Sequence, residues 1–352
     1  MSRHYNHNNR HCEHHDQIVS EYKDEIFKHM RELQDEMLPD PNYMAIKQRE
    51  TGLDWRMRSS LILWLVEVHS GYHLREEIIF LAINYLDRFL SLKEVSIDRL
   101  QLVGTIALSI AVKYEGQRVR MKSLPKLCGG AYKAEDFRKA EIYMLDKLRY
   151  KLGWPGPLIF VRKINEIDAW ESGARILAKY LLEAILPDES FVAERPSITA
   201  AATYCLARCM LGMGEWTPLH VRISEYNYSQ LYPLMAAILE WLNEHLKHSC
   251  LEVFDKYFLR RNLRVARFVK EKLDSGFVIG DQCPASIVSV ELDAKNSSDE
   301  DSSSNEGSSS NEGSSSNEGS SSNEGSSSNE ESSLNEGSSS YEDCNSEIYF
   351  SI

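Results

Sequence analysis

Hydrophobic residues recur every three to four positions through most of the chain between residues 18 and 280, which is the spacing of amphipathic helices. The first run extends from Ile18 to Met37 and is closed by Pro39 and Pro41. Three further segments place apolar residues on one helical face. The first contains Met57, Leu61, Trp64, Leu65 and Val68, the second Ile78, Ala82, Tyr85 and Phe89, and the third Val103, Ala107, Ile110 and Tyr114. No convincing alternation of apolar and polar residues, the mark of strands, interrupts them. The pattern predicts an all-α protein.

Two helices rich in small residues form a weak internal echo, "LVGTIALSIAVKY" at 102–114 and "ITAAATYCLARCML" at 198–211. Small residues let neighbouring helices approach closely, which suits a central helix surrounded by others; good helix propensity alone is the alternative. Between them, "GWPGP" at 153–157 cannot be helix interior and predicts an inter-domain linker.

Both ends of the chain differ in composition from this body. Residues 1–17 are polar and His-rich, and residues 281–352 repeat the hexamer SSSNEG with variations. Neither can bury enough apolar surface to offset chain entropy, so we expect both to be disordered. Each hexamer sets a glutamate three residues after a serine, as acid-directed kinases favour; phosphorylation and a neutral repeat expansion both remain open.

Charge is distributed unevenly. Residues 281–352 hold sixteen acidic residues and one basic residue, so of the formal net charge of −13 the remainder carries only +2. A general nucleic-acid binder would need a concentrated basic face. The basic stretch "FLRRNLRVARFVKEK" at 258–272 is predicted to be an amphipathic outer helix with Leu263, Ala266 and Val269 facing inward; the alternative is a contact with an acidic partner or nucleic acid.

Catalytic and metal-binding signatures are missing from the sequence. Phosphate-binding glycine loops, metalloprotease and serine-hydrolase motifs do not occur, and the seven cysteines include no CxxC pair. "HCEHH" at 11–15 offers ligand types, but adjacent positions cannot form a closed tetrahedral site alone. We therefore expect no metal, no cofactor and no enzyme. Apolar runs are too short for a membrane span, and residues 1–16 contain no signal-peptide core, so we expect an intracellular protein.

The order of motifs resembles a cyclin. "MRSSLILWLVEVHSGYHLREEIIFLAINYLDRFLS" (57–91) and "DRLQLVGTIALSIAVKYEG" (98–116) are similar to a cyclin box, and "EDFRKAEIYMLDKLRYKLGWPGP" (135–157) resembles its last helix and exit. "LAKYLLEAILPD" (177–188) and "SITAAATYCLARCMLG" (197–212) resemble a second cyclin fold. The lead-in at 18–50, with its "PNYM", is similar to that of fungal B-type mitotic cyclins.

This resemblance implies two consecutive five-helix cyclin folds, at 53–152 and 153–280, after an N-terminal helix and lead-in at 18–52. It further implies a non-catalytic subunit that binds and activates a cyclin-dependent kinase, controls mitotic entry and helps select substrates, in the nucleus and cytoplasm. No nucleic-acid or membrane partner is expected.

The resemblance also assigns a kinase-binding surface. Lys113 and Glu141 match the polar pair that grips the mobile helix of the kinase. The apolar part of that contact matches Tyr114, Leu145, Tyr150 and Leu152. From the residues alone, Lys113 would instead be a lysine snorkelling at a helix C-terminus, where its charge suits the dipole.

A second surface matches the patch that takes Arg-x-Leu peptides of substrates or inhibitors. Its residues are Met57, Leu61, Trp64, Glu67 and Gln101, although ordinary core is the alternative, above all for Leu61. Arg58 and Asp87 match a buried pair that pins the first helix of the box to the second. Two departures from the family pattern stand out: Ser60 replaces a larger apolar residue in the patch, and Gly116 replaces an acidic residue after "KYE".

Two other readings compete with the kinase subunit. Cyclin-fold DNA-binding adaptors usually carry a zinc ribbon and a basic body, and this sequence has neither CxxC pairs nor a strong positive balance. A cyclin of the transcriptional class is disfavoured by the lead-in at 18–50.

Overall fold

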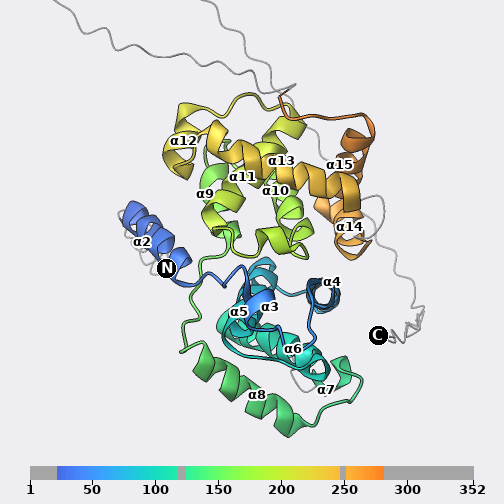
Figure 1. Ribbon diagram of the computed structural model, residues 1–352. Coiled ribbons are helices and arrows are strands. Elements are labelled where there is room, and N and C mark those ends of the chain that lie inside the picture. Colours follow the sequence, from blue (N-terminus) through green and yellow to red (C-terminus); the bar gives the residue numbers. More distant parts are fainter. Residues whose placement is uncertain (1–21, 118–123, 246–250, 281–352) are drawn as a thin grey trace, which may run out of the picture. The chain divides into compact units, whose positions relative to one another are not determined.

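A computed structural model of the chain describes residues 22–117, 124–245 and 251–280 (Figure 1). Every regular element in these three ranges is a helix, which confirms the all-α prediction. The chain divides after Val288 into two units, and all described residues belong to the first. The His-rich N-terminus, with its "HCEHH", and the hexamer repeats lie outside the described residues.

The first bundle is built around α6. The helices before the linker are α2 (Lys23–Glu36), α3 (Tyr43–Ile46), α4 (Trp55–Gly71), α5 (Glu76–Leu92), α6 (Ile97–Tyr114), α7 (Leu124–Leu127) and α8 (Ala134–Lys147). Helix α2 is not part of that bundle and contacts the second one, where Arg31 donates to the carbonyl of Ser224 at 2.8 Å. Helices α4, α5 and α8 all pack on α6, whose residues from Leu102 to Val112 are buried without exception. The small residues of this stretch allow the close approach, so the expectation of a central helix is confirmed.

The second group repeats this plan around α11. Its elements are α9 (Pro157–Asn165), α10 (Ser172–Ala184), the 3-10 helix η2 (Glu189–Phe191), α11 (Pro196–Leu211), α12 (Pro218–Ser224), α13 (Tyr228–His245), α14 (Leu251–Phe258), the 3-10 helix η3 (Arg260–Asn262) and α15 (Val265–Asp274). Helices α9, α10 and α13 pack on α11, and nearly all of its residues are buried. Two bundles, each with a small-residue helix at its centre, therefore follow one another along the chain.

The segment between the bundles behaves as its glycines and prolines predict. Helix α8 ends at Lys147, and α9 begins at Pro157, whose fixed φ and missing N–H suit the first helical position. Gly156 precedes it as the N-cap. The exact domain boundaries at 53, 153 and 280 stay predictions.

The prediction of one helix over 258–272 is wrong. Helix α14 ends at Phe258, the 3-10 helix η3 follows, and α15 begins only at Val265. Leu263 and Arg264 have φ values of 53° and 55°, a left-handed conformation that no helix continues through. Leu263 is consequently 53% exposed instead of facing inward, whereas Ala266 is buried as expected.

Candidate protein-binding surfaces

Lys113 and Glu141 form an ion pair between two helices. Lys113 lies in the last turn of α6 and its Nζ is 2.5 Å from Oε1 of Glu141, in the middle of α8. The apolar stripe before the lysine is buried, but the lysine side chain itself is 51% exposed and the glutamate 23%. An exposed pair of this kind contributes at most about 1 kcal/mol to folding. The two charges are therefore available at the surface, on two helices fixed by the core.

Apolar side chains flank this pair. Tyr114 and Tyr150 are 50% and 67% exposed, and Leu145 and Leu152 are half-buried. The hydroxyl of Tyr114 lies over Gly153, only 3.0 Å from where a Cβ there would be. Tyr114 is the last residue of α6 and Leu145 lies on α8, whereas Tyr150 and Leu152 lie on the segment between α8 and α9.

Two side chains of α5 form hydrogen bonds with the turn after α8. The hydroxyl of Tyr85 donates to the carbonyl of Leu152 at 2.7 Å, and the guanidinium of Arg88 donates to the carbonyl of Lys151 at 2.9 Å. Arg149 and Tyr150 both have positive φ, near 54° and 55°. Burial raises the pKa of Tyr85, which therefore stays a neutral hydroxyl donor. These two anchors were not predicted from the sequence; the signal for them was the presence of polar groups in α5, which is almost wholly buried.

A groove continues this surface toward α2. It is lined by Tyr22, Ile26, Met30 and Leu33 on one side and by Tyr114 and Trp154 on the other. Tyr22 and Ile26, at the start of α2, are 47% and 38% exposed. The apolar face predicted for α2 is therefore only partly buried in the core.

The residues of the predicted peptide-docking patch lie on α4 and on the first turns of α6. Glu67 is exposed, and Met57, Trp64 and Gln101 are half-buried. Leu61 is only 6% exposed and presses on Gly104 of α6, where an added Cβ would lie 2.9 Å from both of its δ-methyl groups. Leu61 therefore belongs to the core beneath the patch, while Ser60 beside it is exposed.

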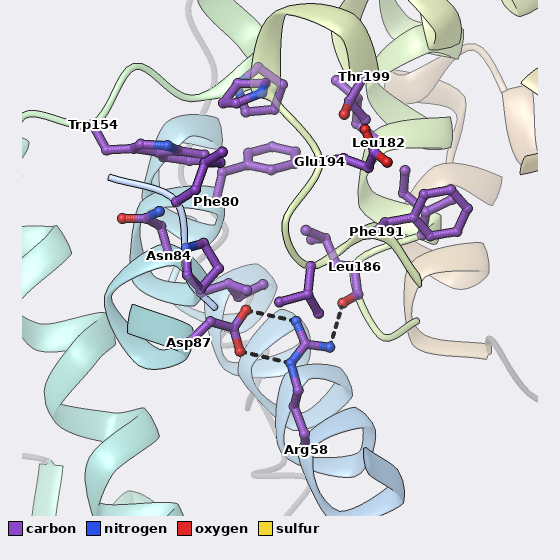
Figure 2. Close-up of a pocket in the computed structure, with 17 residues that line it drawn as sticks. Arg58, Phe80, Asn84, Asp87, Trp154, Leu182, Leu186, Phe191, Glu194 and Thr199 are labelled. Atoms are coloured by element: carbon purple, nitrogen blue, oxygen red, sulfur yellow. Dashed lines mark hydrogen bonds and ion pairs between the residues drawn. The ribbon is translucent and has the colours of Figure 1, made fainter. Parts of the chain in front are cut away.

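Arg58 and Asp87 meet in the interior, as Figure 2 shows. Both oxygens of the Asp87 carboxylate accept from the guanidinium, each at 2.8 Å, and the two side chains are only 2% and 3% exposed. Tyr43 of α3 donates to the same carboxylate at 2.9 Å. Burial would lower the pKa of Arg58, but the charge and hydrogen bonds of Asp87 outweigh it and raise that pKa.

Arg58 also reaches the second bundle. It donates to the carbonyls of Leu186 and Pro187, each at 3.2 Å, beyond the end of α10. A cavity of about 80 Å³ lies next to the pair, between α5 and the segment that joins α10 to α11 (Figure 2). It is too small for an ordinary ligand site, which takes about 300 Å³ or more. The link to the second bundle was not predicted, because backbone carbonyls leave no trace in the sequence.

Further polar contacts join the two bundles. Glu76 and Glu77, at the start of α5, pair with Lys179 and Arg162 respectively. Burial opposes ionisation of Glu77, but the hydrogen bond and charge of Arg162 hold its pKa below the usual value. These contacts fix the second bundle against the helix that also supports the turn after α8.

A buried histidine lies in the contact between α4 and α14. Nε2 of His69 is 2.8 Å from the carbonyl of Arg75, so this nitrogen donates, and Nδ1 has no hydrogen-bond partner. Burial, together with the nearby charge of Lys256, lowers the pKa of His69 to about 4. Lys256 itself is held by the fully buried Glu183 at 2.6 Å.

Within the described ranges, no three His, Cys, Asp or Glu side chains gather as they would to hold a metal ion. In the same part of the chain, no helix combines the length and apolar character needed to cross a membrane.

Comparisons with known proteins agree with this architecture. The family model described as "Cyclin, N-terminal domain" matches residues 25–153, and "Cyclin, C-terminal domain" matches residues 155–271. Among curated relatives, a G2/mitotic-specific cyclin-4 of Candida albicans is 43% identical over 255 residues, which are 72% of this chain and 52% of the relative. A G2/mitotic-specific cyclin-4 of Saccharomyces cerevisiae is 40% identical over 256 residues, 72% of this chain and 55% of the relative. The chain therefore spans just over half the length of these relatives.

Solved structures show the same fold at low sequence identity. A viral cyclin from herpesvirus saimiri gives a TM-score of 0.53 at 16% identity and covers 61% of this chain and 95% of its own. A chain of the yeast RNA polymerase II CTD kinase complex CTDK-1 gives 0.51 at 15% identity, over 68% of this chain and 84% of its own. With two family models in tandem, fungal G2/mitotic-specific relatives near 40% identity and a matching fold, the chain belongs to the cyclin family.

Proposed function

We propose that this chain is a non-catalytic regulatory subunit that binds and activates a cyclin-dependent kinase and so controls mitotic entry. The G2/mitotic-specific names of its fungal relatives support the setting. The observation that carries the proposal is the Lys113–Glu141 pair, which is solvent-accessible, fixed on two core helices and flanked by the exposed Tyr114 and Tyr150.

The geometry suits the task of holding a kinase helix. An active kinase needs the glutamate of its mobile helix turned inward to pair with the phosphate-binding lysine. A partner can hold that helix with an apolar surface plus a few polar contacts, as in other helix-in-groove recognition. The exposed tyrosines supply the surface, and Lys113 and Glu141 supply one donor and one acceptor for polar groups of the kinase.

The rigidity of the surface matters as much as its chemistry. Tyr150 stands on a turn tied to α5 by two hydrogen bonds, from Tyr85 and Arg88. A surface that is already ordered loses little conformational freedom on binding. Its binding energy therefore remains available to move the kinase helix instead of ordering the subunit.

We propose the patch on α4 as the docking site for Arg-x-Leu peptides. The exposed carboxylate of Glu67 would take the arginine, and the half-buried side chains of Met57 and Trp64 would form the slot for the leucine. Gln101 borders the patch from α6. Leu61 would support the slot from beneath, and the small Ser60 makes one wall lower.

Affinity measurements with the full chain and a cyclin-dependent kinase of the same organism test the first proposal. The Lys113→Ala/Glu141→Ala variant should bind at least about tenfold more weakly, since it loses two central polar contacts. A matched control is Glu135→Ala/Lys139→Ala, which removes another exposed ion pair of α8, with a 3.2 Å separation. Equal affinity of the natural chain and the Lys113/Glu141 variant would overturn the proposed contact.

The docking patch is tested with peptide substrates that carry or lack an Arg-x-Leu segment. Glu67→Ala should raise the KM of the assembled kinase only for the substrate with the segment, and leave kcat unchanged. A similar rise for both substrates would contradict a docking role.

We also propose a nuclear and cytoplasmic location, which the family role requires. A fluorescent fusion excluded from the nucleus throughout the division cycle would argue against it.

A further inference from the structure

The turn between α14 and α15 carries an exposed mixture of apolar and basic side chains. Phe258, Leu259 and Leu263 are 44%, 45% and 53% exposed. The exposed arginines among them are Arg260, Arg261 and Arg264. We call these residues the 258–264 turn. It lies between the two orange helices of Figure 1, which pack against each other.

The 258–264 turn has a defined backbone. The side-chain amide of Asn262 donates to the carbonyl of Lys256 at 2.6 Å, and the N–H of Leu263 donates to the carbonyl of Arg260 at 3.1 Å. On either side, Tyr257 and Val265 are buried and anchor the two helices. The apolar side chains are therefore presented on an ordered support.

This backbone is costly for the residues that adopt it. Leu263 and Arg264 are left-handed without being glycine, a conformation in which the Cβ crowds the following carbonyl oxygen. Leu263 recovers only part of this cost by burial, because it is 53% exposed. Backbone strain of this kind clusters at functional and ligand-binding sites, so a strained turn that also exposes a leucine points to a role for its surface.

The charges of the turn identify the chemistry of that partner. Two neighbouring basic residues are neutralised in place: Lys256 by Glu183 at 2.6 Å and Arg267 by Glu271 at 2.7 Å. Among the described residues, none forms an ion pair with the three arginines of the turn, Arg260, Arg261 and Arg264. Guanidinium groups pair with carboxylates in a planar, two-bond geometry, which favours arginine at such contacts.

We propose that the 258–264 turn binds an acidic segment of another protein in which apolar side chains lie between the carboxylates. The arginines would pair with the carboxylates, and Phe258, Leu259 and Leu263 would cover the apolar side chains. A nucleic-acid backbone offers nothing to the two leucines. A membrane would bury little apolar area of so short a turn, compared with the long apolar face of an interfacial helix. The proposal does not depend on kinase binding.

Binding of short synthetic peptides to the full chain tests this directly. The probe peptides alternate glutamate with leucine or phenylalanine; in two control sets glutamine replaces the glutamates, or serine replaces the apolar residues. We expect micromolar binding of the probes, weakened by added salt, and loss of binding in both control sets. Arg260→Gln/Arg261→Gln/Arg264→Gln should weaken binding at least roughly tenfold, since three weak, exposed charge pairs are lost together.

A second variant separates this surface from net charge. Arg267→Gln/Lys270→Gln/Lys272→Gln removes the same charge from α15 and should bind the probes almost as well as the natural chain. Equal melting temperatures of the two variants show that both are folded.

Three results would overturn the proposal. The first is no binding of any probe peptide at high micromolar concentration. The second is equal weakening by the two triple variants. The third is tighter, turn-dependent binding to a thymidine oligonucleotide or to phosphatidylserine vesicles than to the probes, which would assign the turn to another class of partner.

Discussion

Replacing Asp87 with alanine should destabilise the protein severely. The change leaves the guanidinium of Arg58, only 2% exposed, without its two 2.8 Å carboxylate contacts and removes the acceptor of Tyr43. Leaving one member of a buried pair uncompensated costs about 3–5 kcal/mol. The two carbonyls beyond α10 continue to accept from Arg58, so the loss should lie within this range and not above it.

Urea unfolding of the full chain measures this cost. The Arg58→Ala/Asp87→Ala double variant should be less destabilised than the sum of the two single variants, by about 0.5–3 kcal/mol of coupling. Glu135→Ala/Lys139→Ala, at the surface of α8, should change the free energy of unfolding by less than about 1 kcal/mol. A loss below about 1 kcal/mol for Asp87→Ala, or full additivity in the double variant, would refute the idea that this pair ties α4, α5 and the second bundle together.

Three further changes follow from the same structure. His69 is neutral at pH 7 in both folded and unfolded chains; below pH 6.5 the unfolded chain takes up a proton that the folded one resists down to a pKa of about 4. The free energy of unfolding should therefore decrease between pH 6.5 and 4. In urea titrations across this range, the decrease should be about 3 kcal/mol smaller for His69→Gln than for the natural chain. Equal decreases in the two proteins would contradict this role of His69. Gly104→Ala forces a Cβ to within 2.9 Å of Leu61 and should unfold at lower urea than Gly71→Ala, where the new Cβ meets nothing within 4 Å. Tyr85→Phe loses the hydrogen bond to the turn after α8 and should cost about 1 kcal/mol and weaken kinase affinity, whereas unchanged affinity would show that the turn does not need this anchor.

Periodicity predicted the helices because burial of one face imposes it. The stripe from Ile18 to Met37 corresponds, in its described part, to α2, and the two small-residue stretches became α6 and α11. The break at Leu263 was not predicted. Tertiary contacts impose the left-handed conformation on this leucine, and a leucine gives no local sequence signal for it as a glycine would. By contrast, Gly116, with φ of 63° after α6, marks a helix end in the ordinary way.

The candidate surfaces were predictable only in part. The resemblance singled out Lys113 and Glu141, and the structure brings them within 2.5 Å of each other. Neither the groove against α2 nor the carbonyl contacts of Arg58 was predicted, since both depend on segments far apart in the chain. For Leu61 the resemblance predicted a position on the docking patch, with the core as the alternative. Helical spacing puts this residue on the face of the patch, but its side chain packs on Gly104 and belongs to the core.

The most direct measurement is the activity of a cyclin-dependent kinase of the same organism, with and without the full chain. The natural chain and the Glu135→Ala/Lys139→Ala control should both raise phosphorylation of a peptide substrate by orders of magnitude. The Lys113→Ala/Glu141→Ala variant, with an unchanged melting temperature, should lose most of that activation. No activation by the natural chain, or equal activation by all three proteins, would contradict the account.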